Sequence, residues 1–150
     1  MRIYIASDHG GYQLKEELKG YLKDKGYQVE DLGNTKFDPE DDYPDFVFPL
    51  ASRVAQGEQG LGIVIGRSGN GETMAANKVK GIRAVVCLNE KMAQKARLDN
   101  DANVLSLGAD YINTETAKKI VDAFLTTLFS GEERHKRRLG KIKNYESSKA

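Results

Sequence analysis

The chain alternates between two hydrophobic periodicities. Short, continuous apolar runs are typical of buried strands, and they alternate with segments whose apolar residues recur every three or four positions, as in amphipathic helices. In residues 12–25, Leu14, Leu18 and Leu22 follow the helical spacing, and Gly26 supplies a stop signal. The pattern predicts strands at 2–7, 27–32, 61–65, 82–88 and 103–107, and helices at 12–25, from 43–45 onward, 71–78, 90–98, 114–129 and 132–145.

Strand and helix alternate five times, which predicts an α/β fold with a five-stranded parallel sheet and helices on both faces. Residues 33–42 form a polar loop, and Pro44 suits the first turn of the next helix. Pro49 is expected to bend that helix or to shift its start. No repeat or linker interrupts residues 1–150, so we expect a single domain with a short frayed end at 147–150.

Composition narrows the class of protein. The 150 residues are 39% hydrophobic and 30% charged, as in soluble globular proteins, and the net charge of +1 provides no overall field toward nucleic acid or a membrane. No apolar run approaches the ~20 residues that span a bilayer, and the N-terminus enters a strand without a signal-peptide segment. The single cysteine, Cys87, is interpreted as a core thiol, and we expect a cytoplasmic protein.

The segment 62–77 is the strongest candidate for chemistry. A buried strand runs into the glycine-rich turn 66–71, which holds Ser68 and is followed at once by Glu72 and a helix. Glycines let backbone N–H groups point at an anion, and a carboxylate beside such a pocket can move a proton while the pocket stabilises developing charge. The same pattern also serves as a tight connection in doubly wound proteins, and it matches neither a P-loop nor a dinucleotide fingerprint.

Other polar groups are placed near the strand ends. Asp8 and His9 follow the first strand, although Asp8 also suits a helix cap. We group the segment 99–101, which lies between a predicted helix and strand 103–107, with the carboxyl ends of the strands. Tyr43 offers either a site hydroxyl or packing at a helix start. The basic run 134–138 is either a solvated face or a phosphate grip, because Arg134 and Arg138 share one helix face.

Six segments, taken together, resemble the ribose-5-phosphate isomerase B family, which includes the galactose-6-phosphate isomerase subunits. They are 5–11, 42–46, 62–72, 75–84, 100–105 and 134–138, in the family's order across almost the whole chain. The resemblance implies a Rossmann-like three-layer sandwich that forms a homodimer or a dimer of dimers with shared active sites. Helix 132–145 would pack on a neighbouring subunit. It also implies conversion of an aldose phosphate to a ketose phosphate without a metal or an organic cofactor, and a small phosphorylated sugar as the partner.

The family's roles carry over to matching positions. Gly66 stands where many members have a cysteine base, and the subgroup without that cysteine uses the glutamate at the position of Glu72. Glu72 would move a proton from carbon 2 to carbon 1 through a cis-enediolate. The oxyanion would be stabilised by Ser68 and by the N–H groups of Gly69, Asn70 and Gly71. Asp8 would orient the sugar hydroxyl groups or exchange protons with them, and Asn100 would also hold the sugar. His9, Arg134 and Arg138 would bind phosphate, the arginines reaching a neighbouring subunit's site.

Three positions depart from the family pattern. Asp99 replaces a histidine that assists ring opening, Asp110 replaces an arginine that grips phosphate, and Arg67 replaces a glycine. Arg67 lies close to the pocket and either restores the lost positive charge or pairs with Asp99 or Asp110 across the dimer. The sequence therefore favours a ribose 5-phosphate isomerase. It leaves open an isomerase of another sugar or a non-catalytic sugar-phosphate-binding homologue.

Overall fold

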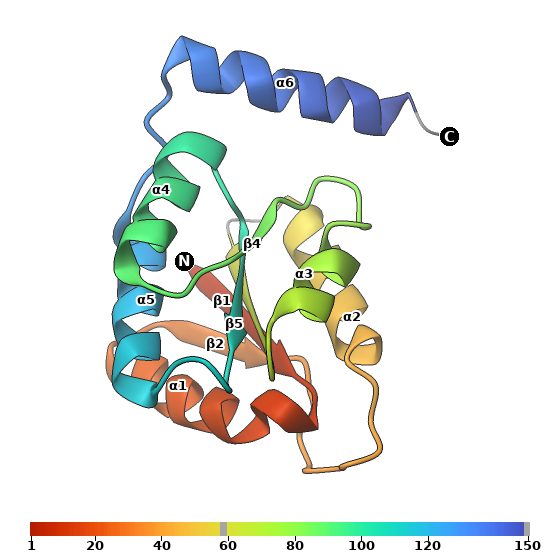
Figure 1. Ribbon diagram of the computed structural model, residues 1–150, viewed down its shortest axis with the longest axis vertical. Helices are drawn as coiled ribbons and strands as arrows, with labels where there is room; N and C mark the ends of the chain where they lie inside the picture. Colours follow the sequence, from red (N-terminus) through yellow and green to blue (C-terminus); the bar gives the residue numbers. More distant parts are fainter. Residues whose placement is uncertain (58–59, 149–150) are drawn as a thin grey trace.

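A computed structural model describes residues 1–57 and 60–148 of the chain (Figure 1). Its strands are β1 (Arg2–Ser7), β2 (Gln28–Asp31), β3 (Gly60–Gly66), β4 (Ala84–Val86) and β5 (Val104–Gly108). Its helices are the short 3-10 helix η1 (His9–Gly11), α1 (Tyr12–Asp24), α2 (Pro44–Ala55), α3 (Asn70–Ala76), α4 (Glu90–Asn100), α5 (Thr114–Thr126) and α6 (Glu133–Ser147).

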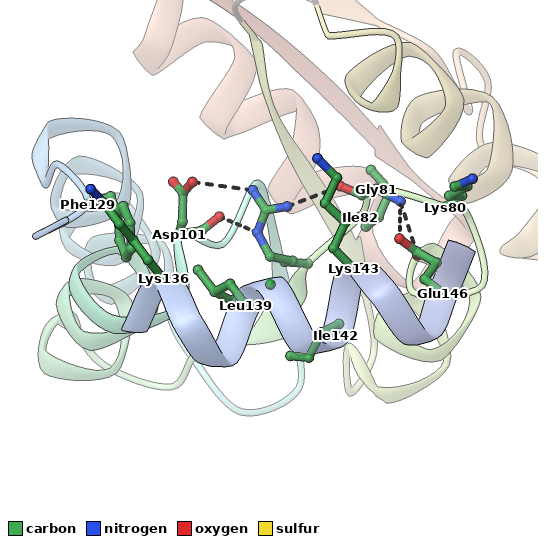
Figure 2. Close-up of a pocket in the computed structure, with 12 residues that line it drawn as sticks. Lys80, Gly81, Ile82, Asp101, Phe129, Lys136, Leu139, Ile142, Lys143 and Glu146 are labelled. Atoms are coloured by element: carbon green, nitrogen blue, oxygen red, sulfur yellow. Dashed lines mark hydrogen bonds and ion pairs between the residues drawn. The ribbon is translucent and has the colours of Figure 1, made fainter. Parts of the chain in front are cut away.

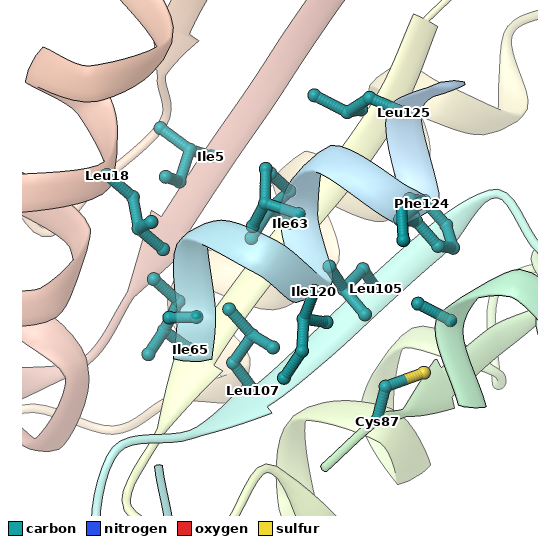
Figure 3. Packing of buried hydrophobic residues seen from close by; sticks show 14 of the residues in the cluster. Ile5, Leu18, Ile63, Ile65, Cys87, Leu105, Leu107, Ile120, Phe124 and Leu125 are labelled. Carbon is teal, nitrogen blue, oxygen red and sulfur yellow. The ribbon is translucent and has the colours of Figure 1, made fainter. Parts of the chain in front are cut away.

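The five strands form one parallel sheet in the order β2-β1-β3-β5-β4. Alternate residues along each strand point to opposite faces, so each strand feeds two cores. Ile3, Ile5 and Ile63 belong to the core that α1, α4 and α5 cover, and Figure 3 shows this packing around Phe124. Val64 belongs to the second core, beneath α2 and α3. The predicted α/β architecture with helices on both faces is therefore confirmed.

Several element ends differ from the sequence prediction. The strand expected at 82–88 covers only Ala84–Val86. Its first backbone N–H groups are taken by side chains, because Arg83 N–H donates to Asn103 Oδ1 at 2.7 Å and Ala84 N–H donates to Asn77 Oδ1 at 2.8 Å. Side-chain amides thus satisfy backbone groups that a longer ladder would otherwise pair.

The helices show corresponding corrections. α2 begins at Pro44 and continues through Pro49, so the internal proline does not shift its start. α4 extends beyond the predicted 98 to Asn100, and α5 ends at Thr126 rather than 129 because Thr127 is extended. Ser147 lies inside α6, so the predicted fraying does not begin there, and residues 149–150 of that prediction lie outside the described part of the chain.

The last helix, α6, stands apart from the sheet layers (Figure 1). It touches α4, and the Glu146 carboxylate accepts hydrogen bonds from Gly81 N–H at 3.0 and 3.1 Å. Between these contacts lies a groove of about 480 Å³, with Leu139 and Ile142 of α6 on one side and Ile82 on the other (Figure 2). Within the described residues, no helix is long and apolar enough to cross a membrane.

Candidate active site

The carboxyl ends of β1 and β3 bring the two N-terminal motifs together. These strands are neighbours, with Ser7 opposite Ile65, so Asp8 and the turn after Gly66 share one edge of the sheet. The chain passes from β1 to β2 on one side and returns to β3 on the other. The site therefore lies at the point where strand order reverses, which is the usual ligand position in open parallel sheets.

Glu72 lies in the first turn of α3, and its residue is only 4% exposed. A Cβ added at Gly66 would collide with its carboxyl group, so the absence of a side chain at Gly66 creates the space that the carboxylate fills. Burial is the largest influence and raises the pKa of Glu72; the hydrogen bond from the Glu72 backbone N–H lowers it by less, and the negative charge of Asp8 adds a smaller increase. A carboxyl group with a raised pKa can both accept and return a proton near neutral pH.

The glycine turn is fixed from the neighbouring strand. Gly69 has φ +81°, a left-handed conformation that favours glycine, and its carbonyl accepts a hydrogen bond from the buried Ser106 Oγ of β5 at 2.8 Å. The Ser68 hydroxyl accepts the N–H of Asn70 at 3.1 Å. That N–H was predicted to face an oxyanion, and here it supports the serine instead. The Ser68 hydroxyl is partly exposed at this turn.

Asp8 caps a short helix, as one of its two interpretations predicted, and its role in the site stays a prediction. Its Oδ1 accepts the N–H of Gly10 at 3.0 Å and so caps η1, while its charge acts on both His9 and Glu72. Burial raises the pKa of Asp8, against the lowering effect of His9. Arg67 is exposed and packs close to this turn, because a Cβ at Gly10 would lie 2.6 Å from Arg67 Cγ.

His9 has a partner that the sequence did not reveal. Its Nδ1 lies 2.7 Å from Asp41 Oδ1, and its backbone N–H donates to the same oxygen at 3.0 Å. Asp41 belongs to the loop that was interpreted only as a polar connection, and no spacing rule links it to a residue 32 positions away. Asp8, His9 and Asp41 each have one atom that could bind a metal, and these three atoms lie within 4.8 Å of one another. The His9 and Asp41 atoms, however, already form a hydrogen bond with each other.

Tyr43 closes this edge of the site from α2. It is the residue before the first turn of α2, and a Cβ at Gly71 would lie 2.5 Å from its Cζ and 2.7 Å from its hydroxyl oxygen. The hydroxyl thus lies against Gly71 of the glycine turn, and Gly71 directly precedes Glu72 in the sequence. The ring packs against the second core, as one interpretation predicted, while the role of the hydroxyl as a site group stays a prediction.

Four predicted site residues lie elsewhere in this chain: Asp99, Asn100, Arg134 and Arg138. Counting 99–101 with the strand carboxyl ends was wrong. These residues end α4 and precede β5, and β5 is parallel to β3, so its start lies at the edge opposite the glycine turn (Figure 1). Arg134 and Arg138 lie at the same far edge, on α6.

This far cluster has its own ion pairs. Asp99 Oδ2 lies 2.8 Å from Lys95 Nζ, and the hydrogen bond from Lys95 lowers the pKa of Asp99, so this carboxyl group is a poor proton donor. His135 Nε2 lies 3.3 Å from Asp99 Oδ1 and 3.1 Å from a Glu132 oxygen, without the alignment of a hydrogen bond to either. Arg134 pairs with Glu132 at 3.0 Å. Within one chain, this cluster and Glu72 therefore lie at opposite edges of the sheet.

Asp110 follows the carboxyl end of β5 and therefore does lie at the edge of the glycine turn. Its backbone N–H donates to the Arg67 carbonyl at 2.9 Å, and its residue is exposed. The charge reversal noted in the sequence is thus placed beside the candidate site rather than in a remote part of the fold.

Comparisons with known proteins agree with this arrangement. A family model described as Ribose/Galactose Isomerase matches residues 3–142. A probable ribose-5-phosphate isomerase B of Mycoplasma pneumoniae is 48% identical, covering 98% of this chain and 96% of its own. The structure of Clostridium thermocellum ribose-5-phosphate isomerase B superposes with a TM-score of 0.96 at 47% identity, with 100% of both chains covered.

A second solved structure contains a sugar phosphate. Ribose-5-phosphate isomerase B of Mycoplasma genitalium, with bound ribulose-5-phosphate, has a TM-score of 0.94 at 46% identity, covering 97% of this chain and 96% of its own. The identity extends over nearly the whole length of every protein compared. The chain therefore belongs to the ribose-5-phosphate isomerase B family of sugar-phosphate isomerases, as its motifs predicted.

Proposed function

We propose that this protein interconverts ribose 5-phosphate and ribulose 5-phosphate, with Glu72 as the base. The observation that carries the proposal is the Glu72 carboxyl group, buried against Gly66 at the carboxyl edge of the sheet with a raised pKa. The relative from Mycoplasma genitalium with bound ribulose-5-phosphate supports the choice of sugar.

In this mechanism Glu72 removes the proton from carbon 2 of the open-chain aldose and returns it to carbon 1. The cis-enediolate between these steps carries negative charge on oxygen, which the Ser68 hydroxyl and the N–H groups of Gly69 and Gly71 stabilise. Asp8 orients the sugar hydroxyl groups and transfers the second proton, from the hydroxyl on carbon 2 to the oxygen on carbon 1, while Tyr43 contributes its hydroxyl beside Gly71. The carbon-bound proton stays on the Glu72 carboxyl group between the two steps, so neither a metal nor an organic cofactor enters the scheme.

The second part of the proposal is a site shared between chains. Asp99, Asn100, Arg134 and Arg138 lie at the far edge, so they join Glu72 only if a second copy presents that edge to it. α6 suits this role because it stands off the sheet and leaves Ile142 58% exposed. We therefore propose a homodimer or a dimer of dimers in which α6 packs on the neighbour. A cytoplasmic location belongs to the same proposal.

The first experiment is isomerisation of ribose 5-phosphate by the purified chain, with Glu72→Gln and Glu90→Gln as matched variants. Glu90 is exposed in the first turn of α4 and tests the same change of charge away from the site. We expect turnover that Glu72→Gln abolishes and Glu90→Gln retains, with binding of the sugar phosphate kept in both. Equal turnover in Glu72→Gln would refute the assignment of the base.

A second candidate function, isomerisation of another sugar, rests on Asp110. This carboxylate lies beside the glycine turn where the resemblance implies an arginine for phosphate, and the matching family model spans ribose and galactose isomerases. A panel of aldose phosphates and free aldoses separates the two candidates. Turnover of another sugar that depends on Glu72, with none of ribose 5-phosphate, would make Asp110 a marker of changed specificity.

A further inference from the structure

We propose that Asp41 is a positioning residue for His9, holding its imidazole as an oriented cation at the phosphate end of the site. This inference rests on the proposed function, in which His9 contacts the phosphate of the substrate. It adds a residue to the site that no sequence motif indicated, and it assigns a fixed charge state to the histidine.

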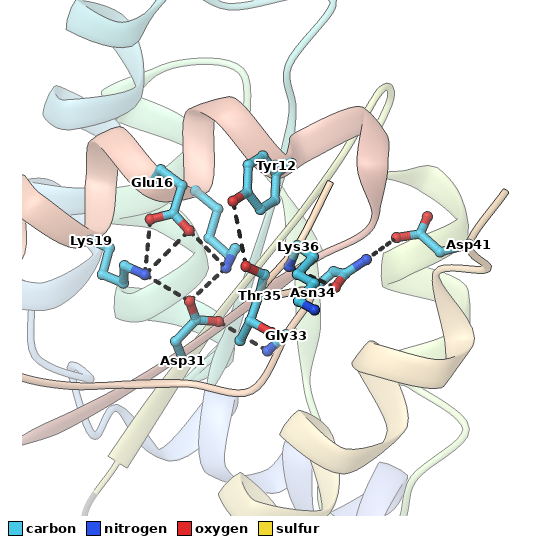
Figure 4. A network of polar contacts seen from close by, with 10 residues as sticks. Tyr12, Glu16, Lys19, Asp31, Gly33, Asn34, Thr35, Lys36 and Asp41 are labelled. Carbon is cyan, nitrogen blue, oxygen red and sulfur yellow. Dashed lines mark hydrogen bonds and ion pairs between the residues drawn. The ribbon is translucent and has the colours of Figure 1, made fainter. Parts of the chain in front are cut away.

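Asp41 contacts His9 at two points, the backbone N–H and the ring, and we call this pair of contacts the clamp. Asp41 Oδ1 lies 3.0 Å from His9 N and 2.7 Å from His9 Nδ1, so one oxygen fixes both the backbone and the ring. The other oxygen, Oδ2, accepts the side-chain N–H of Asn34 at 2.7 Å (Figure 4). The Asp41 side chain is 6% exposed, whereas that of His9 is 26% exposed, so the carboxylate is covered and the ring remains reachable.

This clamp determines which ring nitrogen meets a ligand. An ionised carboxylate only accepts hydrogen bonds, so Nδ1 of His9 carries the proton that faces Asp41. In a neutral ring Nε2 would then be an acceptor, which suits no oxygen of a fully ionised phosphate. Only the protonated ring donates from Nδ1 to Asp41 and from Nε2 to phosphate at the same time. The second donor is therefore available only when His9 is positively charged.

The surrounding charges favour that cation. The hydrogen bond that His9 Nδ1 donates to Asp41 is the largest influence and raises the pKa of His9, and the charges of Asp8 and Asp41 act in the same direction. Desolvation and the guanidinium of Arg67 oppose them without reversing the shift. In Asp41, burial favours the neutral acid, yet the hydrogen bonds from His9 and Asn34 keep its pKa below the ordinary value. The pKa shifts of both groups thus favour a protonated His9 paired with an ionised Asp41.

The loop that carries Asp41 is itself anchored to β1. Ser7 N–H donates to the Gly33 carbonyl and Asn34 N–H donates to the Ser7 carbonyl, both at 2.7 Å. Asn34 thus joins the end of β1 through its backbone and Asp41 through its side chain. The position of Asp41 is therefore defined by the same strand that places His9, which is the arrangement that a positioning residue requires.

The direct test is the titration of the imidazoles by nuclear magnetic resonance on the full-length protein. The chain contains only two histidines, so His9→Gln assigns the signals. In the unmodified protein we expect the pKa of His9 to lie above that of an exposed histidine and inorganic phosphate to shift its Nε2 signal. Asp41→Asn should lower that pKa, whereas Glu40→Gln, which removes a charge from an exposed neighbour in the same loop, should leave it unchanged.

Kinetics provide a readout that a loss of folding cannot imitate. The KM of Asp41→Asn for ribose 5-phosphate should match that of the parent protein at pH 6 and exceed it about tenfold at pH 8.5, with kcat nearly unchanged, because loss of a charge-assisted bond has that scale. Taking the ratio of KM values at each pH cancels the titration of the substrate phosphate. A ratio that does not vary with pH would contradict the proposal.

The two proposals fail separately. If no variant turns over ribose 5-phosphate while phosphate still shifts the His9 signal in a manner that depends on Asp41, the function is wrong and the clamp stands. If the parent protein is active but its His9 pKa is ordinary, or is unaffected by Asp41→Asn, the clamp is refuted. The titration of the parent protein needs no variant, so the test survives a variant that does not fold.

Discussion

The buried ion pair between Lys15 and Asp31 predicts an asymmetry between two substitutions. The Lys15 side chain is fully buried, and its Nζ lies 2.6 Å from Asp31 Oδ2. Asp31 also accepts Lys19 Nζ at 2.9 Å and Gly33 N–H at 2.9 Å, as Figure 4 shows around its carboxylate. Asp31 therefore has other hydrogen-bond partners, whereas among the described residues Lys15 Nζ has, besides Asp31, a Glu16 oxygen at 3.5 Å and the Tyr12 ring, whose centroid lies 5.5 Å away. Removing the acid should cost more than removing the base.

The magnitudes follow from which charge is left behind. Asp31→Asn strands a buried ammonium group, and such losses cost about 3–5 kcal/mol, so we expect about 3 kcal/mol with Glu16 as a weak substitute. Lys15→Met replaces the ammonium with apolar volume and leaves Asp31 paired, for about 1 kcal/mol or less. At about 2–4 °C per kcal/mol for a chain of this size, Tm should fall by about 6–12 °C and by about 2–4 °C respectively.

The assay is denaturant and thermal unfolding of both single variants and the double variant, all at one protein concentration. Glu30→Gln is the control, because Glu30 is in the same strand but its side chain is 34% exposed in its pair with Arg53, and we expect about 1 kcal/mol or less. The double variant should resemble Lys15→Met, since the stranded charge is gone. If Lys15→Met costs as much as Asp31→Asn, the reasoning fails.

The acid side of the stability profile supplies a second check. Burial raises the pKa of Asp31, but the hydrogen bonds from Lys15, Lys19 and Gly33 outweigh it and hold the pKa below the ordinary value of 3.8. The stabilisation is therefore complete above that value and is lost as pH falls through the folded pKa. The difference between the parent protein and Asp31→Asn should shrink on acidification, and a difference that grows would contradict this assignment.

Three further predictions concern the turn and the buried ionisable groups. Gly66→Ala presses a Cβ into the Glu72 carboxyl group and should lower kcat about tenfold or more, whereas Gly20→Ala, where a Cβ meets nothing within 4 Å, should leave kinetics unchanged and raise stability by about 0.5–1 kcal/mol. Because the pKa of Glu72 is raised, kcat/KM should fall as pH drops through it, and a pH–rate profile without that limb would exclude Glu72 as the base. Burial raises the pKa of Cys87 to about 11, so a thiol reagent at pH 8 should label the native protein far more slowly than the unfolded one.

Long periodic segments were predictable because burial alone determines them. The leucines of 12–25 and the apolar runs of 2–7 and 61–65 point to the core in any parallel sheet, and all three elements lie where they were expected. The start of β4 was not predictable, because Asn77 and Asn103 compete for its backbone through contacts that form only after folding. Element ends depend on such pairings, whereas element type depends on periodicity.

The site was predictable as far as motif residues follow a strand. Asp8 and Glu72 come together because β1 and β3 pair, which the alternation of elements implies. Asp99 was assigned to the wrong edge of the sheet. It lies at the end of α4, whereas the residues at the carboxyl edge are those that follow a strand. Asp41 was missed altogether, since a loop acid shows no periodicity and its partner is set by the path of the loop.

The clamp between His9 and Asp41 also joins the proposed phosphate-binding residue to a loop. If His9 binds an anion, anion binding and local opening of the loop are thermodynamically coupled. Local opening of residues 34–41 breaks the contact with His9, so any anion that needs the cationic ring binds the closed loop more tightly than the open one. Reciprocity requires that the same anion slow amide hydrogen exchange in this loop by the factor by which opening weakens its binding. Anion binding at the site should therefore be measurable as slower amide exchange in residues 34–41, a loop that contains none of the residues of the sequence motifs.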